Sequence, residues 1–151
     1  MDKEKMIKEI NRLKKEKNAV LLAHYYQEGS IQDIADFTGD SLYLSQVAAE
    51  TDADIIVFAG VHFMAETAKI LSPDKKVLLP VSEAGCPMAD MATDLRLSTY
   101  KKNNPDRKIV AYVNTTARVK ALADICVTSS NAEKIIKHYK GEKLMYVPDK
   151  N

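Results

Sequence analysis

VLLAHYYQEGSIQDIADFTGDS, residues 20–41, is the stretch that decides the fold of this chain. It opens with the apolar run 20–23 and turns polar at residues 24–27, where all four side chains carry hydrogen-bonding atoms. A short helical pattern follows, and residues 39–41 (GDS) open another helix. Open α/β sheets build ligand sites where a buried strand ends near a helix N-terminus. The stretch therefore predicts a ligand site at the end of the first strand.

Composition limits the classes of protein to which the chain can belong. Its 151 residues are 46% hydrophobic, which is enough for one packed domain. The 22 Lys and Arg residues nearly balance the 21 Asp and Glu residues, so no basic field favours nucleic acid. The sequence holds no apolar stretch long enough to cross a bilayer and no signal-peptide pattern. We therefore expect a cytoplasmic protein with neither a nucleic-acid nor a membrane partner, in which Cys86 and Cys126 form no disulfide.

Helical and strand patterns alternate along the chain. The helical patterns cover residues 2–17, 30–37, 40–50, 62–71, 94–103, 118–122 and 130–139. The strand patterns cover residues 20–26, 54–59, 76–80, 108–113, 124–127 and 143–147. Capping boxes are expected at Ser30 with Asp33 and at Ser130 with Glu133. This alternation predicts the α/β class, with parallel sheets in three-layer αβα units.

The chain also contains an internal repeat. An offset of 88 residues places Ala23 on Ala111 and Asp36 on Asp124 without a gap. Chance, or a general likeness between any two βα units, could give so few identities. The matching order of strand, helix and cap favours a duplicated unit, and hence a pseudo-symmetric repeat.

The repeat sets the expected domain organisation. We expect a first α/β domain over residues 1–106, with a loop at 81–92, and an incomplete second domain over 107–151. The second copy ends at its second strand, which would leave a sheet edge unpaired and a covering helix absent. The sequence therefore predicts a truncated chain, or one that needs a partner.

Polar side chains collect at the predicted strand ends of both copies. His24 and Tyr26 follow the first strand, and Tyr112 and Asn114 occupy the matching positions of the second copy. Imidazole, phenol and amide groups can bind carboxylate or phosphate oxygens, and two facing copies would direct both sets into one cleft. His24 could serve there as acid, base or donor, or could be a structural hydrogen-bonding residue.

Ser41 and Ser129 lie at or next to predicted helix N-termini. Free backbone N–H groups there favour an anion, by about 0.3–1 kcal/mol at an exposed site. Plain helix capping would explain the same two serines. The sequence leaves both interpretations open, and the repeat favours a ligand because both serines would point the same way.

Cys86 lies in the turn-forming segment 83–90 (EAGCPMAD), where its sulfur could be presented to a cofactor. Iron–sulfur ligands often precede a proline, but one cysteine cannot hold a cluster and the chain has no CxxC or HExxH pattern. These residues alone leave Cys86 open between a ligand and a bystander. Cys126 has apolar neighbours and is predicted to pack in the core. His62 and His138 are expected on the surface.

Several long motifs resemble those of the quinolinate synthase family, in the family's order and over essentially the whole chain. They are LLAHYYQ, DIADFTGDSLYL, FAGVHFMAE, GCPMAD, YVNTTARVKALAD, CVTSSNAEKII and VPDKN. The resemblance implies three similar α/β domains around a central site with a 4Fe–4S cluster. It also implies a transferase of NAD biosynthesis, which condenses iminoaspartate with dihydroxyacetone phosphate to quinolinate, releasing phosphate and water.

The resemblance further implies roles for single residues. Cys86 would be the first of three cluster ligands, with the other two beyond the chain end, and the cluster would act as a Lewis acid. Tyr26 would move protons, and His24 would donate to an anionic oxygen. The residues implied to bind substrate are His24, Ser41, Tyr112, Val113 (through its backbone), Asn114 and Ser129.

About half of a family member would lie outside this sequence, so we expect the 151-residue chain to be inactive alone. L-Aspartate oxidase would be the upstream supplier of iminoaspartate. Two other interpretations stand beside the enzyme: a non-enzymatic α/β module that binds a small carboxylate or phosphate, and the product of a truncated gene.

Overall fold

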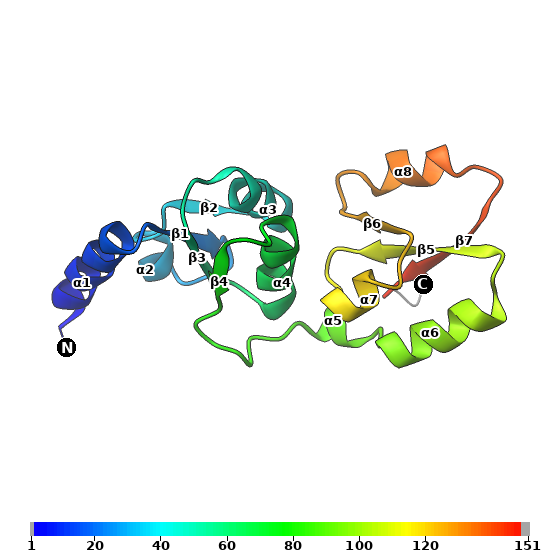
Figure 1. Ribbon diagram of the computed structural model, residues 1–151, viewed down its shortest axis with the longest axis horizontal. Helices are drawn as coiled ribbons and strands as arrows, with labels where there is room; N and C mark the ends of the chain where they lie inside the picture. Colours follow the sequence, from blue (N-terminus) through cyan, green and yellow to red (C-terminus); the bar gives the residue numbers. More distant parts are fainter. Residues whose placement is uncertain (1, 149–151) are drawn as a thin grey trace. The chain divides into compact units, whose positions relative to one another are not determined.

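The computed structural model describes residues 2–148 and divides into two compact units, Met1–Ala84 and Gly85–Asn151 (Figure 1). Each unit holds one sheet of parallel strands with helices on both sides, which confirms the predicted α/β class. Within residues 2–148, no helix combines the length and the apolar character needed to span a bilayer.

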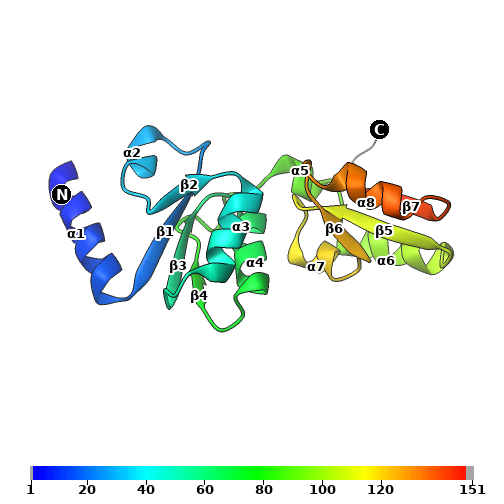
Figure 2. The ribbon, with the colours of Figure 1, turned by 90° about the horizontal axis from the view of Figure 1, so that it is seen from above.

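The first unit is built on a four-stranded sheet in the order β2-β1-β3-β4. Its strands are β1 (Ala19–His24), β2 (Phe37–Gly39), β3 (Ile55–Ala59) and β4 (Lys76–Leu78). Its helices are α1 (Lys3–Glu16), α2 (Gly29–Gln32), α3 (Ser41–Glu50) and α4 (His62–Leu71). Figure 2 shows α3 and α4 on one side of the strands and α1 and α2 on the other, which gives the unit its three layers.

The second unit is built on a three-stranded sheet in the order β6-β5-β7. Its strands are β5 (Arg107–Tyr112), β6 (Ile125–Val127) and β7 (Lys143–Val147). Its helices are α5 (Pro87–Asp90), α6 (Asp94–Asn103), α7 (Ala117–Lys120) and α8 (Ala132–His138). In Figure 1, α8 covers one side of this sheet, and α6 and α7 cover the other.

The strand pairings of the two sheets agree at the offset of 88 residues found in the sequence. Leu22 pairs with Phe37 in the first sheet, and Val110 pairs with Ile125 in the second. The same offset converts every β1–β3 pair into a β5–β7 pair. The pseudo-symmetry of the whole units stays a prediction, and this shared register supports it.

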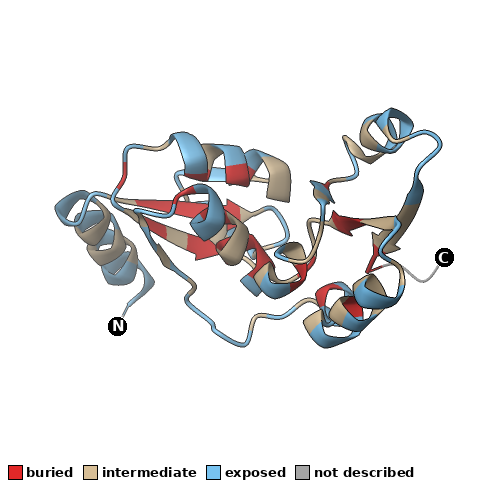
Figure 3. Cartoon of the chain, turned by 45° about the vertical axis from the view of Figure 1, so that its right-hand side comes forward, coloured by how far each residue is buried: buried red, intermediate tan, exposed pale blue. Residues whose placement is uncertain are grey.

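Apolar side chains on one face of each central strand form a core with the short helix that follows the strand. At the offset of 88, the set Leu21, Ala23, Ile31, Ile34, Ala35, Val57 and Ala59 becomes Ile109, Ala111, Val119, Leu122, Ala123, Met145 and Val147. Figure 3 shows the buried residues in the strands and on the inward sides of the helices. Full burial of a Val, Leu, Ile or Met side chain contributes roughly 1.5–3 kcal/mol to stability, so these cores hold the strands and short helices together.

The strand β2 is the main departure from the expected secondary structure. The sequence predicts a helix over residues 30–37, but α2 stops at Gln32, and residues 37–39 form a strand that pairs with β1. A Cβ on Gly39 would lie 2.3 Å from the ring of Tyr43, so any larger residue at position 39 would force that ring to move. Both predicted capping boxes are wrong, because Glu28 and Asn131 occupy the N-cap positions and neither side chain caps its helix.

Two further expectations differ from the structure. Cys126 is exposed rather than in the core, because the three-residue strand β6 forms the edge of its sheet. The compact units divide after Ala84, earlier than the domain boundary expected at residue 106. The helix α6 accounts for this division, since Leu97 and Tyr100 pack into the core of the second unit.

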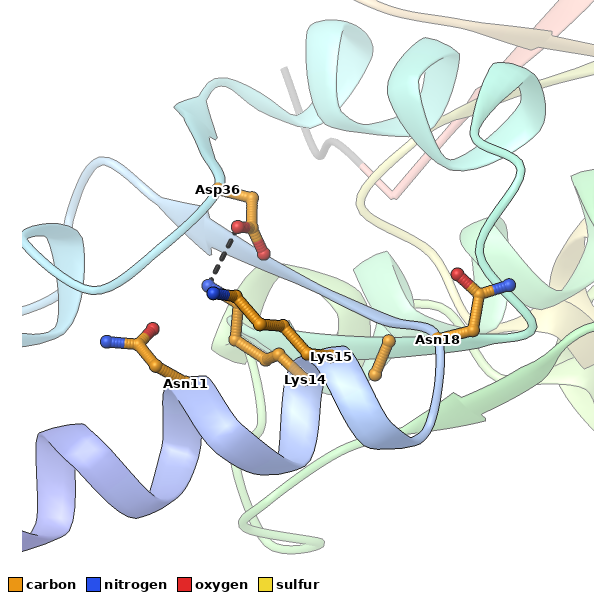
Figure 4. Close-up of a pocket in the computed structure, with 6 residues that line it drawn as sticks. Asn11, Lys14, Lys15, Asn18 and Asp36 are labelled. Carbon is orange, nitrogen blue, oxygen red and sulfur yellow. Dashed lines mark ion pairs between the residues drawn. The ribbon is translucent and has the colours of Figure 1, made fainter.

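An aspartate supports the central strand of the first sheet at its edge. The Asp36 carboxylate accepts a hydrogen bond from the Leu21 N–H at 2.8 Å, and the Asp36 N–H donates to the Leu21 carbonyl at 2.9 Å. Lys14 forms an ion pair with Asp36 at 2.7 Å and donates to the Ile34 carbonyl at 3.1 Å (Figure 4). Asp36 thus extends the pairing of β1 beyond β2 and ties α1 to the sheet.

Asp124 makes the same contacts in the second unit. Its carboxylate accepts from the Ile109 N–H at 2.8 Å, and its own N–H donates to the Ile109 carbonyl at 2.9 Å. Lys101 lies 3.3 Å from this carboxylate and donates to the Leu122 carbonyl at 2.8 Å. The hydrogen bond from Ile109, and after it that from Lys101, holds the pKa of Asp124 below its ordinary value.

Replacing Asp124 by asparagine should lower the free energy of unfolding by about 1 kcal/mol at pH 7, because the amide keeps the acceptor but loses the charge. The folded-state pKa of Asp124 is lowered, so its contribution is present above the unfolded value of 3.8 and is lost as pH falls through the folded-state pKa. Urea unfolding at pH 7 and in acid measures both effects. Asp74→Asn, at an exposed turn position, is the control. A loss from Asp124→Asn that does not shrink in acid would contradict the charge-based account.

Candidate functional site

The carboxyl ends of the strands in the first sheet lie at one edge, because all the strands run parallel. From β1 the chain continues to β2 on one side and then crosses to β3 on the other side of β1. Open α/β sheets bind ligands at such a topological switch point. The segments that meet there are the loop after β1, the turn from β2 into α3 and the turn from β3 into α4.

His24 is the last residue of β1 and is half-buried. Its ring stacks on that of Tyr25 with centroids 4.6 Å apart, and the ring of Tyr26 meets it edge-on at 4.7 Å. The Tyr26 N–H donates to the His24 Nδ1 at 3.4 Å, so the neutral imidazole carries its proton on Nε2. His24 therefore offers an N–H donor, and the phenol of Tyr26 beside it is exposed.

The charge state of His24 is set by two opposing effects. Partial burial lowers the pKa of His24, and the nearby carboxylate of Asp40 opposes this shift. Asp40 also caps α3, because its side chain accepts from the Tyr43 N–H at 2.8 Å. At pH 7 the imidazole is therefore mainly neutral and suits a hydrogen-bonding role.

Ser41 is the first residue of α3, which confirms its predicted place at a helix N-terminus. The pairing of His24 with Gly39 puts the end of β1 beside the turn that leads to Ser41. The capping role belongs to Asp40 rather than to Ser41. The first unit thus gathers His24, Tyr26 and Ser41 at one edge of its sheet.

The second unit brings together two more of the predicted residues. The Tyr112 phenol and the Ser129 hydroxyl lie 2.6 Å apart at the ends of the neighbouring strands β5 and β6. Ser129 does not begin a helix, because it precedes α8 in a loop where the Asn131 side chain accepts from the Thr128 N–H at 2.7 Å. Ser129 therefore lies two residues before the N-cap Asn131, near the helix N-terminus rather than at it, and its position at a strand end is as expected.

Val113 and Asn114 follow β5 directly and are half-buried. The Val113 N–H donates to the Val127 carbonyl at 2.8 Å, which extends the β5–β6 pairing by one residue. The Tyr25 N–H makes the equivalent bond to the Gly39 carbonyl at 3.1 Å in the first unit. The common cleft that would join the polar sets of the two units stays a prediction.

Cys86 is a free thiol at the N-cap position of α5, half-buried and followed by Pro87 as the first helical residue. A thiolate there fits one ligand position of an iron–sulfur cluster. Within residues 2–148, no group of three or more His, Cys, Asp or Glu side chains could hold a metal ion. The part of the chain that the structure describes can thus supply one cluster ligand, and a cluster would need further ligands from elsewhere.

A further contact at the switch point joins His62 to Glu66 and was not predicted from the sequence. His62 begins α4 directly after β3, and its Nε2 lies 3.4 Å from the Glu66 carboxylate one helical turn later. Its N–H donates to the Ala84 carbonyl at 2.7 Å, two residues before Cys86. His62 is exposed, as expected, but the i, i+4 spacing of a histidine and a glutamate could have indicated the pair. His138 is also exposed, with its ring edge-on to Tyr139.

Two pockets lie away from these strand ends. One, of about 550 Å³, lies beside α1 and the start of β1, where Lys14 is paired with Asp36 (Figure 4). The other, of about 720 Å³, lies between β6 and α8 and is lined by Ile125, Asn131, Lys134, Ile135, Lys137, His138 and Tyr139. Neither pocket is lined by a predicted site residue.

Comparison with known proteins gives a consistent result. Residues 8–151 match the family model described as quinolinate synthetase A protein. A quinolinate synthase of Aquifex aeolicus (strain VF5) is 61% identical over 142 residues, covering 94% of this chain and 44% of that protein. A quinolinate synthase of Caldicellulosiruptor saccharolyticus is 56% identical over 151 residues, covering 100% of this chain and 50% of that protein. The chain spans about half the length of the curated relatives that it matches.

Replacing Asp40 by asparagine should lower the pKa of His24 further. Asparagine keeps the cap on α3 but removes the negative charge that favours the imidazolium. NMR titration of the imidazole, assigned with a His24→Gln variant, measures the shift. Asp74→Asn removes an equal charge elsewhere and should leave His24 unchanged. A His24 pKa that stays constant or rises in Asp40→Asn would show that this carboxylate does not act on the imidazole.

Proposed function

The chain belongs to the quinolinate synthetase A protein family, and we propose that it forms part of a quinolinate synthase. The reaction would condense iminoaspartate with dihydroxyacetone phosphate to quinolinate, with release of phosphate and water. The observation that carries this proposal is the set of polar side chains at the carboxyl edges of two sheets with the same register. Both substrates are anions, and these edges offer imidazole, phenol, hydroxyl and amide groups to anionic oxygens.

Within this proposal, different strand-end residues would bind different parts of the substrates. Ser41 and Ser129 would anchor carboxylate or phosphate oxygens, while Tyr112 and Asn114 would orient the part derived from iminoaspartate. The backbone of Val113 would contribute beside them.

The proton-transfer and donor roles would fall to the loop after β1. The neutral imidazole of His24, with its proton on Nε2, would donate to an anionic oxygen. Tyr26, with 79% of its surface exposed beside that ring, would move protons.

Cys86 would supply one ligand to a 4Fe–4S cluster, whose other protein ligands would come from outside residues 2–148. When bound, the cluster would act as a Lewis acid on a substrate oxygen during dehydration. The thiol of Cys86 is half-buried and free, which suits it to this role. By contrast, Cys126 is exposed at the edge of its sheet, yet partial desolvation by its neighbours raises the pKa of its thiol, although Lys120 opposes the shift. A raised pKa disfavours the thiolate form that binds metal, so we do not propose Cys126 as a ligand.

The proposal extends to the setting of the enzyme. We place it in the cytoplasm, with small-molecule substrates and without nucleic-acid or membrane partners, and with L-aspartate oxidase as the supplier of iminoaspartate. The alternative of a non-enzymatic carboxylate- or phosphate-binding module is not favoured, because the matched relatives are named as synthases.

Cys86→Ser should abolish cluster binding and quinolinate formation, whereas Cys126→Ser should leave both unchanged. The test protein is a chimera in which this chain replaces the matching segment of the Aquifex aeolicus enzyme, reconstituted with iron and sulfide under anaerobic conditions. Iron, sulfide and quinolinate are measured together. Full iron and sulfide content in Cys86→Ser would refute the ligand assignment, even if turnover were lost for another reason.

The 151-residue chain alone should form no quinolinate when iron and sulfide are supplied anaerobically. Its described residues contain two cysteines, Cys86 and Cys126, and no group of three or more His, Cys, Asp or Glu side chains that could hold a metal ion, so they cannot hold a cluster alone. Quinolinate is measured with iminoaspartate generated in the assay, and the chimera serves as the positive control. Turnover by the isolated chain above the level without protein would overturn this expectation.

A further inference from the structure

We propose that Gln32 and Lys120 are positioning residues, which fasten the two loops that carry the polar strand-end side chains. This inference rests on the proposed function, because it concerns the same site. Each residue acts on a loop backbone within its own unit, and neither is assigned a contact with substrate.

Gln32 ends α2, and its side chain reaches back to the loop after β1. Its Nε2 donates to the Gln27 carbonyl at 2.7 Å and to the Tyr25 carbonyl at 3.0 Å. The Gln27 N–H donates in turn to the His24 carbonyl at 2.9 Å. One amide group therefore holds the backbone on both sides of Tyr26.

Lys120 ends α7 and reaches back to the loop after β5. Its Nζ donates to the Thr115 carbonyl at 2.5 Å. Thr115 is fully buried, and its hydroxyl donates to the Tyr112 carbonyl at 2.9 Å. The loop that carries Val113 and Asn114 is thereby fixed at both of its ends.

The two fastenings correspond in position but not in chemistry. The offset of 88 residues places Gln32 on Lys120 and Gln27 on Thr115. A neutral amide in one unit and an ammonium in the other thus donate to equivalent backbone carbonyls, those of Gln27 and Thr115. The two loops share a donor at this position rather than a particular side chain, which indicates that the loop geometry is what requires it.

The cores do not depend on either donor. The preceding residue of each short helix, Ile31 or Val119, packs into the hydrophobic core, whereas Gln32 and Lys120 are half-buried. Their hydrogen bonds end on loop carbonyls outside the strands. Loss of a donor should therefore loosen its loop at a free energy below that of global unfolding.

Gln32→Met and Lys120→Met remove the donors and keep unbranched side chains. Hydrogen exchange by mass spectrometry on the 151-residue chain should show about tenfold faster exchange in the affected loop, as expected for loss of about one net hydrogen bond. Gln32→Met should affect residues 25–28 and spare 113–116, and Lys120→Met should do the reverse. Each variant thus contains its own reference loop.

Exchanging the donors provides the rescue. Gln32→Lys and Lys120→Gln should restore protection, because each keeps an N–H donor that the other unit uses at this position. Gln46→Met and Lys102→Met, at exposed positions of α3 and α6, are the matched controls and should change neither loop. Unchanged exchange in both methionine variants, or an equal rise along the whole chain, would overturn the proposal.

Activity in the Aquifex aeolicus chimera separates this inference from the proposed function. In an active chimera, Gln32→Met should lower kcat/KM by about tenfold or more, and Gln32→Lys should recover most of the loss. If the chimera is active and Gln32→Met leaves its kcat/KM unchanged, the positioning role is overturned and the proposed function stays intact. An unsubstituted chimera that forms no quinolinate would overturn the proposed function alone, because loop exchange is measured without substrate.

Discussion

The strands β1 and β5 are each hydrogen-bonded to a parallel neighbour on both edges, and the rest of each unit follows from this constraint. Parallel sheets must be covered on both faces, which accounts for helices on either side of β1 and β5. On one edge the neighbouring strand has only three residues. Asp36 and Asp124 lengthen the pairing there by offering a side-chain acceptor to the central strand.

Parallel pairing also determines where chemistry can occur. All the strands of a sheet end at the same edge, so polar residues that directly follow the apolar runs gather there without any longer-range signal. His24 lies beside the turn to Ser41 because β1 is paired with β2, and Tyr112 reaches Ser129 because β5 is paired with β6. The loops that carry these side chains lie outside the ladder and therefore need a separate fastening.

Local patterns in the sequence predict the bounds of a helix or strand correctly where those bounds depend only on residues within or next to the element. The predicted helices 62–71 and 94–103 and the strand 143–147 agree with α4, α6 and β7. The strand β2 could not be predicted in this way, because it has only three residues, none of them buried, and it is defined by its pairing with the distant strand β1. The roles of Gln32 and Lys120 could not be predicted from the sequence for a related reason. A side chain that donates to a backbone carbonyl has no sequence motif, and the two residues that the repeat aligns are of different types.

The repeat conserves backbone positions more closely than side chains, and this difference bears on what the site can recognise. At the offset of 88, a histidine that partial burial keeps mainly neutral matches Tyr112, and the exposed Tyr26 matches the half-buried Asn114. Each sheet edge thus presents its own set of donors on a backbone of the same register. Within the proposed function, these unlike sets would serve two substrates that differ in charge and in proton demand. The fold thus sets where binding groups lie, and a few side chains at the strand ends set what is bound.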